Sequence, residues 1–193
     1  MKKITIALIM VISLIAPIQT MAESVTQNGT IIEPLEQNIE QIIDEITSEP
    51  RPINSDAIQN VKEYISEYFG NQGYDNIEYQ KFEYNDENNE NAIRHSSQAD
   101  VFLASTAENA IVDGIGENII VTKNSSIDTT KNLIISAHYD SAEDSVGAND
   151  NGSGVAAVLE LARILKDTEM PYNVKFILFS GEEKYMLGSR WYV

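Results

Sequence analysis

The second half of the chain alternates apolar runs with one amphipathic stretch. Residues 133–137 form a continuous apolar run, and residues 174–179 form another, as expected of strands that are covered on both faces. Between them, apolar positions three and four residues apart predict a helix. Its buried stripe consists of Val155, Val158, Leu159, Ala162 and Leu165. Strand, loop, helix and strand in this order predict an α/β domain with a largely parallel sheet.

The pattern in the first half is weaker. Residues 23–50 are polar and acidic, and their spaced apolar positions predict one short amphipathic helix. These positions are Leu35, Ile39, Ile42, Ile43 and Ile46. The segment is interpreted as either a propeptide or a packed N-terminal arm, and its sequence favours neither.

From Arg51 onward the polar and apolar positions again predict regular elements. Ser55 is the expected N-cap of a helix that Gly70 closes as its C-cap. The apolar face of this helix carries Ile58, Val61, Ile65 and Tyr68. Extended structure is expected at 77–84, with further strands at 101–104 and 118–121.

The first 22 residues have the anatomy of a secretory signal peptide. Lys2 and Lys3 precede an uncharged run at 4–18, and Thr20-Met21-Ala22 follows. This pattern predicts cleavage after Ala22 and a secreted, extracellular protein. The alternative is a membrane anchor, but the run is shorter than the about 20 residues of a spanning helix. No stable membrane insertion is therefore expected after processing.

Composition restricts the chemistry and the partners. The chain contains no cysteine, so any metal must be held by His, Asp or Glu. Its formal net charge of −17 argues against nucleic acid as a partner, because binding phosphates requires clustered Lys and Arg. The charge alone indicates only an acidic exported protein.

Residues that can bind a metal or act as acids and bases follow both apolar strands of the second half. One strand runs into His138 and Asp140, the other into Glu182 and Glu183, and Asp150 lies in the glycine-rich loop between them. In open α/β sheets, sites form beyond the carboxyl ends of the strands. These five residues are therefore expected to converge at one edge of the sheet.

Each of these residues also has an ordinary structural interpretation. His138 alone is as easily a hydrogen-bonded core residue, but a carboxylate such as Asp140 typically orients a metal-bound imidazole. Asp150 alone suits a turn or helix cap, although a carboxylate can also bridge two metals. Glu182 and Glu183 directly after a buried strand are costly without partners. One held by a metal and one free as a base would account for both.

A serine mechanism is the chief rival from the residues alone. Ser153 lies in the sequence Asn-Gly-Ser-Gly, and His138 is available as a base. The nucleophile elbow requires Gly-x-Ser-x-Gly, whereas position 151 is Asn and Gly154 follows the serine directly. This mismatch argues against a serine nucleophile.

The motifs of the second half closely resemble those of the di-zinc aminopeptidase family. They are His138-Tyr139-Asp140-Ser141, the loop at 147–154, Gly181-Glu182-Glu183 and Leu187-Gly188-Ser189. The resemblance extends from about Arg51 to the last residue. It implies a three-layer α/β/α sandwich with a mostly parallel mixed sheet, and peptide substrates from which N-terminal residues are removed.

The resemblance also implies roles for individual residues. His138 is implied as a ligand of one zinc ion and Glu183 as a ligand of the other, with Asp150 bridging the two. Glu182 is implied as the general base, and Asp140 as the carboxylate that orients the histidine. Cobalt or manganese in place of zinc, and carboxypeptidase in place of aminopeptidase action, remain open.

The family requires two further ligands, an Asp and a His, after the double glutamate. Residues 51–193 are therefore expected to be a partial zinc-peptidase domain, incomplete at its C-terminus and inactive as it stands. His95 is the only other histidine and is interpreted as an ordinary surface residue. The alternative function is a non-catalytic α/β binding domain derived from such a peptidase.

Overall fold

A computed structural model describes residues 25–27, 30–32, 34–84 and 114–193. The predicted signal peptide, the predicted strand at 101–104 and His95 lie outside the described residues.

The sheet has four strands in the order β3-β4-β6-β5. Their bounds are Ile77–Tyr84 for β3, Gly114–Lys123 for β4, Asn132–His138 for β5 and Asn173–Phe179 for β6. The β5–β6 pair is parallel, whereas β3–β4 and β4–β6 are antiparallel. A separate short hairpin is formed by β1 (Val25–Gln27) and β2 (Thr30–Ile32).

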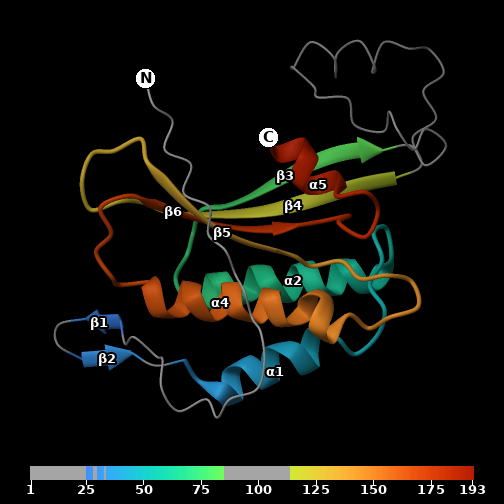
Figure 1. The fold of residues 1–193 in the computed structure, drawn as a ribbon, viewed down its shortest axis with the longest axis horizontal. Helices are drawn as coiled ribbons and strands as arrows, with labels where there is room; N and C mark the ends of the chain where they lie inside the picture. The colour runs from blue at the N-terminus through green and yellow to red at the C-terminus, as the bar shows by residue number, and fades with distance from the viewer. Residues whose placement is uncertain (1–24, 28–29, 33, 85–113) are drawn as a thin grey trace, which may run out of the picture.

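Helices lie on both sides of the sheet. The helices α1 (Glu36–Ile46), α2 (Asp56–Asn71) and α4 (Ser153–Leu165) cover one face, and the short α5 (Leu187–Tyr192) lies on the other, over β3 and β4 (Figure 1). The predicted α/β class, its layers and its mixed sheet are confirmed. Among the described strands, parallel pairing is confined to β5 and β6, so the sheet is less parallel than expected.

The core lies between the sheet and the three helices on one face. The predicted stripe of α4 is buried, and it belongs to one apolar cluster with buried side chains of β4, β5 and β6. Three aromatic rings fill the centre of this layer: Phe69 and Tyr74 meet edge to face with ring centroids 5.7 Å apart, and each lies about 6 Å from Phe176. This packing attaches β6, one of the two inner strands, to the helical layer.

The two apolar strands differ in burial, which corrects one prediction. In β6, Val174, Phe176 and Leu178 are fully buried, as expected. In β5, Ile134 remains 45% exposed, because β5 is the edge strand of the described sheet and α4 packs against only one of its faces. The prediction that β5 is covered on both faces is therefore wrong for the described structure.

The end of α2 corrects a second prediction. The helix continues past Gly70 to Asn71, and the residue with left-handed backbone is Gly73, at φ 79°. The Gly73 amide donates to the Gly70 carbonyl at 2.8 Å, and the Tyr74 amide donates to the Phe69 carbonyl at 3.0 Å. This is a Schellman motif, in which the glycine must stand just beyond the helix. At the other end, the Ser55 hydroxyl accepts from the Ile58 amide at 3.1 Å, which confirms the predicted N-cap.

The helix predicted in the N-terminal segment is present and packs into the core. Ile42 and Ile46 are each 1% exposed. Glu160 of α4 accepts hydrogen bonds from the Leu35 amide at 2.8 Å and from the Asn38 side chain at 2.6 Å. Apolar and polar contacts therefore both attach α1 to α4.

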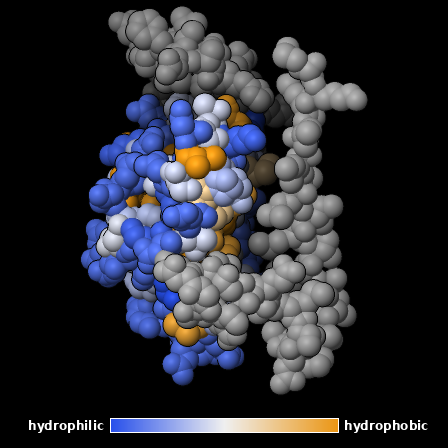
Figure 2. Space-filling model, turned by 90° about the vertical axis from the view of Figure 1, so that its left-hand side faces the viewer, coloured by the Kyte–Doolittle hydropathy of each residue, from blue (hydrophilic) through white to orange (hydrophobic). Residues whose placement is uncertain are grey.

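The end of the molecule where β5 and β6 begin is mainly hydrophilic, with scattered hydrophobic residues (Figure 2). Within the described part of the chain, no helix is both long and apolar enough to cross a bilayer.

Candidate metal site

The candidate residues meet because β5 and β6 are parallel and end side by side. His138, the last residue of β5, is the register partner of Phe179, the last residue of β6. The chain segments that follow each strand therefore leave the same edge of the sheet. One carries Asp140 and Asp150, and the other carries the two glutamates, as the sequence predicted.

The imidazole of His138 lies between the two segments and is 8% exposed. Its Nδ1 lies 3.2 Å from the backbone oxygen of Asp140 and 3.5 Å from the Asp140 carboxylate. Its Nε2 lies 3.0 Å from Oδ1 of Asp150 and 3.8 Å from Oε2 of Glu182. Nδ1 thus faces the strand end, and Nε2 faces the carboxylates at the open side.

Asp140 is 1% exposed, and its carboxylate has a second function beyond its contact with His138. Oδ1 accepts a hydrogen bond from the amide of Glu182, and Oδ2 accepts one from the amide of Glu183, each at 3.1 Å. The chain reverses just before these amides at Gly181, which has φ 72°. The carboxylate therefore holds the backbone that presents both glutamates, a role that sequence reasoning did not identify.

Asp150 lies in a turn, η1 (Ala148–Gly152), that precedes α4. Its φ of −119° and ψ of 94° depart from helical values, so its side chain projects from the turn and is 77% exposed. The turn begins at Gly147 with φ 58°, and the Gly152 amide donates to the Gly147 carbonyl at 2.9 Å. Two glycines thus frame the residue that faces His138.

Arg51 is the residue of this site that sequence reasoning missed. It is fully buried, and its guanidinium donates to the backbone oxygens of Tyr139 at 2.7 Å, Gly147 at 3.1 Å and Val146. Its own amide donates to the Ser141 hydroxyl at 2.9 Å. The only signal in the sequence was an isolated cation between two prolines.

The titration of these groups reflects the concentration of negative charge. Burial alone lowers the pKa of His138, but the hydrogen bonds and charges of Asp140, Asp150 and Glu182 together raise it to about 9. Burial and then the charge of Asp150 raise the pKa of Glu183. Burial lowers the pKa of Arg51, and the charges of Asp140 and Glu183 oppose that effect. The cluster is therefore an environment that favours a bound cation.

The donor atoms suit a divalent metal. One nitrogen of His138 and one carboxylate oxygen each of Glu182 and Glu183 lie within 4.8 Å of one another, and Asp150 is in direct contact with the same histidine. Imidazole nitrogen and carboxylate oxygen are ordinary zinc ligands. The grouping contains both glutamates, so these distances do not separate a ligand from a free base.

Ser153 does not join this cluster. Its hydroxyl donates to the Asn149 carbonyl of η1 at 2.8 Å, and the residue is exposed. The contact expected of a nucleophile, a hydrogen bond to His138, is instead made by Asp150.

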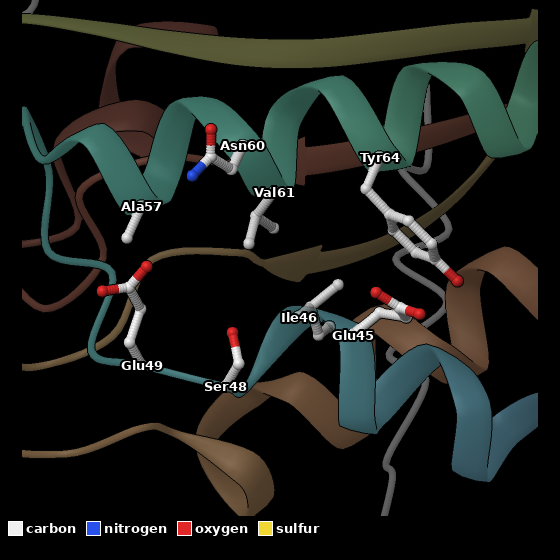
Figure 3. A pocket seen from close by; sticks show the side chains of 8 residues that line it. All are labelled: Glu45, Ile46, Ser48, Glu49, Ala57, Asn60, Val61 and Tyr64. Atoms are coloured by element: carbon white, nitrogen blue, oxygen red, sulfur yellow. The ribbon is translucent and has the colours of Figure 1, made fainter.

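Two pockets in the described structure lie away from the cluster. One, of about 140 Å³, lies between the end of α1 and α2, where Glu45 lies opposite Tyr64 and Glu49 opposite Ala57 (Figure 3). The other, of about 220 Å³, lies at the opposite end of the sheet, beside Lys123 and Lys166. Neither is lined by one of the candidate ligands.

Known proteins are similar to this chain in sequence and in fold. Residues 118–193 match the model of Peptidase family M28. Aminopeptidase YwaD of Bacillus subtilis is 42% identical over 85 residues, which are 44% of this chain and 19% of that protein. A vacuolar membrane protease of Schizosaccharomyces japonicus is 32% identical over 148 residues, which are 77% of this chain and 16% of that protein. The chain thus spans less than a fifth of these relatives.

Solved structures of aminopeptidases have a similar fold. An aminopeptidase from Aneurinibacillus sp. strain AM-1 superposes with a TM-score of 0.62 at 19% identity, over 81% of this chain and 65% of that one. BSAP, a zinc aminopeptidase from Bacillus subtilis, superposes with a TM-score of 0.62 at 18% identity, over 79% of this chain and 63% of that one. Together with the M28 match, they confirm the predicted resemblance to the zinc aminopeptidase family over part of the chain.

Proposed function

We propose that the chain forms part of an exported metallopeptidase that removes N-terminal residues from peptides with two zinc ions. The observation that carries this proposal is the position of His138 Nε2, 3.0 Å from Asp150 and 3.8 Å from Glu182, on a buried strand end. The M28 match supports a peptidase, and the likeness to a zinc aminopeptidase supports the metal.

The residues have distinct roles in this proposal. His138 and Glu183 would each hold one zinc ion, and Asp150 would be a ligand that both ions share. When bound, the metal supplies Lewis-acid activation of the peptide carbonyl and of the attacking water. Glu182 accepts the proton of that water and passes it to the leaving amine. Asp140 orients the imidazole and holds the backbone of both glutamates.

The described residues supply too few ligands for two ions. A catalytic zinc ion typically keeps three protein ligands and a water, whereas His138, Asp150 and Glu183 provide three side chains in total. We therefore expect the polypeptide of residues 23–193 to bind at most one zinc ion, weakly, and to leave a leucine anilide uncleaved. Two bound zinc ions with turnover would contradict this expectation and make His95 the next residue to substitute.

Zinc binding by single variants tests the roles without requiring turnover. Asp150→Asn should lose most of the zinc affinity, because Asp150 is the ligand that both ions share. His138→Ala and Glu183→Gln should each lower it, because each removes a ligand of one ion. Glu182→Gln is the matched control and should retain zinc. Calorimetric titration with zinc alone gives the affinity and the stoichiometry. Undiminished binding by His138→Ala would refute the proposed centre, and loss of zinc only in Glu182→Gln would reverse the roles of the glutamates.

In a polypeptide that carries all the ligands, Glu182→Gln should also abolish most of the turnover. A general base typically contributes about 10²–10⁴-fold to the rate. Steady-state hydrolysis of a leucine anilide by zinc-loaded protein measures this effect. A variant with normal zinc content and normal turnover would exclude Glu182 as the base.

Export is a separate part of the proposal. Its support is the basic, apolar and small-residue pattern that ends at Ala22. Intact-mass analysis of secreted material should give a protein that begins at Glu23. Retention of residues 1–22 in the mature protein would contradict export by cleavage.

A further inference from the structure

Arg51 lies beneath the candidate site with no access to solvent. A buried guanidinium is costly unless its donors are used. Here they are directed at the backbone oxygens of Tyr139, Val146 and Gly147. These acceptors lie at the two ends of the loop at 139–147, so one side chain closes the loop as a clamp.

The clamp is reinforced at the backbone of Arg51. Its amide donates to the Ser141 hydroxyl at 2.9 Å, and the Ser141 amide donates to the Arg51 carbonyl at 3.3 Å. The Ser141 hydroxyl in turn donates to the Ser145 carbonyl at 2.8 Å. The start and the end of the loop are thus attached to the same residue.

The loop connects directly to Asp150. The Gly147 carbonyl accepts both from Arg51 and from the Gly152 amide, which closes the turn that contains Asp150. A Cβ added at Gly147 would lie 3.3 Å from the guanidinium nitrogen, and one added at Gly152 would lie 3.7 Å from it. The guanidinium is therefore packed against both glycines that frame Asp150.

We propose that Arg51 is a positioning residue that sets Asp150 opposite His138 by clamping the loop at 139–147. The proposal rests on the proposed zinc-binding function of these residues. Lysine cannot replace this arrangement, because its single ammonium group lacks the planar fork that reaches several fixed acceptors. The position of Asp150 thus requires the several hydrogen bonds of the guanidinium more than its positive charge.

The first test compares zinc affinity in the full chain with and without the clamp. Arg51→Lys should weaken zinc binding by about tenfold or more, in the range typical of groups that orient metal ligands. The matched control is Phe69→Leu, a core substitution in α2 away from the site, which should lower the melting temperature but leave the zinc affinity of the folded protein unchanged. Equal zinc affinities for Arg51→Lys and the wild-type chain, or an equal loss in Phe69→Leu, would overturn the proposal.

A milder variant covers the case in which Arg51→Lys does not fold. Ser141→Ala removes the hydroxyl that bonds Arg51 to the loop but leaves the guanidinium in place. It should weaken zinc binding by a smaller factor, about threefold. Unchanged zinc affinity in a folded Ser141→Ala protein would contradict the clamp.

A metal-free measurement separates this proposal from the proposed function. Native-state hydrogen exchange of the Gly152 amide reports whether the turn stays closed. In Arg51→Lys, or in Ser141→Ala to a lesser degree, that amide should exchange about tenfold faster, while core amides of α4 such as Leu159 keep their protection. If the wild-type chain binds no zinc, the proposed function fails, yet unchanged exchange at Gly152 would still refute the role of Arg51.

Discussion

The loop at 139–147 after β5 and the turn that begins at Gly181 after β6 both position side chains at the candidate metal site. The backbone of each segment is held by a buried side chain, and the two side chains have opposite charges. The loop presents carbonyl oxygens inward, and the buried cation of Arg51 binds them. The turn presents amide groups inward, and the buried anion of Asp140 binds them. Each charge is satisfied by backbone dipoles on a segment distant in sequence.

The two segments also differ in how they reach left-handed backbone. The loop uses Gly147, at φ 58°, where a side chain would have no space. The turn continues from Gly181 to Tyr185 and Met186, at φ 65° and 57°, although both carry side chains. Left-handed backbone costs a residue with a Cβ roughly 1–2 kcal/mol. The turn after β6 is therefore the more strained of the two supports.

Removing the buried anion should have the largest effect. Asp140→Ala leaves the Glu182 and Glu183 amides without their charged acceptor, and hydrogen bonds to charged groups contribute about 1.5–3 kcal/mol each. The free energy of unfolding should fall by about 3 kcal/mol in urea denaturation of the metal-free protein. Asp144→Ala, an exposed carboxylate on the same loop, is the control and should change little. A fall of less than about 1 kcal/mol would show that Asp140 does not stabilise the backbone of Glu182 and Glu183.

A methyl group at the start of the Asp150 turn should have the next largest effect. In Gly147→Ala the added Cβ would lie 2.5 Å from the Asp150 carbonyl and 2.7 Å from the Ser141 Cβ. We expect a loss of about 2 kcal/mol in unfolding free energy, with weaker zinc binding.

Gly70→Ala is the matched control for this substitution. Gly70 lies inside α2 with open space around its Cβ position. It should stabilise the protein by about 0.5–1 kcal/mol, because alanine favours a helix interior. Equal effects of the two substitutions in denaturation would show that the turn is not tightly packed.

Zinc affinity should depend on pH because His138 must lose its proton to bind zinc, and the carboxylates of both segments favour its protonated form. The pKa of His138 is raised to about 9 in the metal-free protein, and zinc binds only the unprotonated imidazole. Below about pH 9, affinity should fall by about tenfold per pH unit, equivalent to 1.4 kcal/mol. Competition with a chromophoric chelator between about pH 6 and pH 8 measures this slope. A flat profile would mean that His138 is not a ligand or is already unprotonated.

Relief of strain in the turn should have the smallest effect. Tyr185 is 51% exposed and at φ 65°, so Tyr185→Gly loses little packing and gains an unstrained backbone. The free energy of unfolding should rise by about 1 kcal/mol. Tyr185→Ala, which keeps a Cβ, should bring no such gain. Equal stability of both variants in urea would show that the strain is negligible.

The sequence was sufficient to predict the residues that meet at the strand ends. His138, Asp140, Asp150 and the glutamates follow apolar strands, and parallel strands of an α/β sheet end at one edge. Arg51 was not predictable in this way, because its partners are backbone carbonyls. The pattern of side chains along a sequence does not indicate which backbone carbonyls a distant side chain will contact.

Local signals were similarly incomplete for the fold. The runs in β5 and β6 look alike, but one strand lies at the edge and the other in the centre, and only the pairing of distant segments decides this. Gly70 and Gly73 both suit a helix end, and the contact between Phe69 and Tyr74 settles the choice. Ser55 was predictable because its cap depends on an amide only three residues further along the chain.

The most direct measurement is the position of zinc itself. Crystals of the full chain grown with zinc, with anomalous data collected at the zinc edge, locate the ion without reference to activity. The account predicts zinc bound to Nε2 of His138 and to carboxylate oxygens of Asp150 or Glu183 at about 2.0–2.2 Å, with Glu182 uncoordinated. An ion bound through Nδ1, held by Glu182 in place of Glu183, or located away from His138 would contradict it.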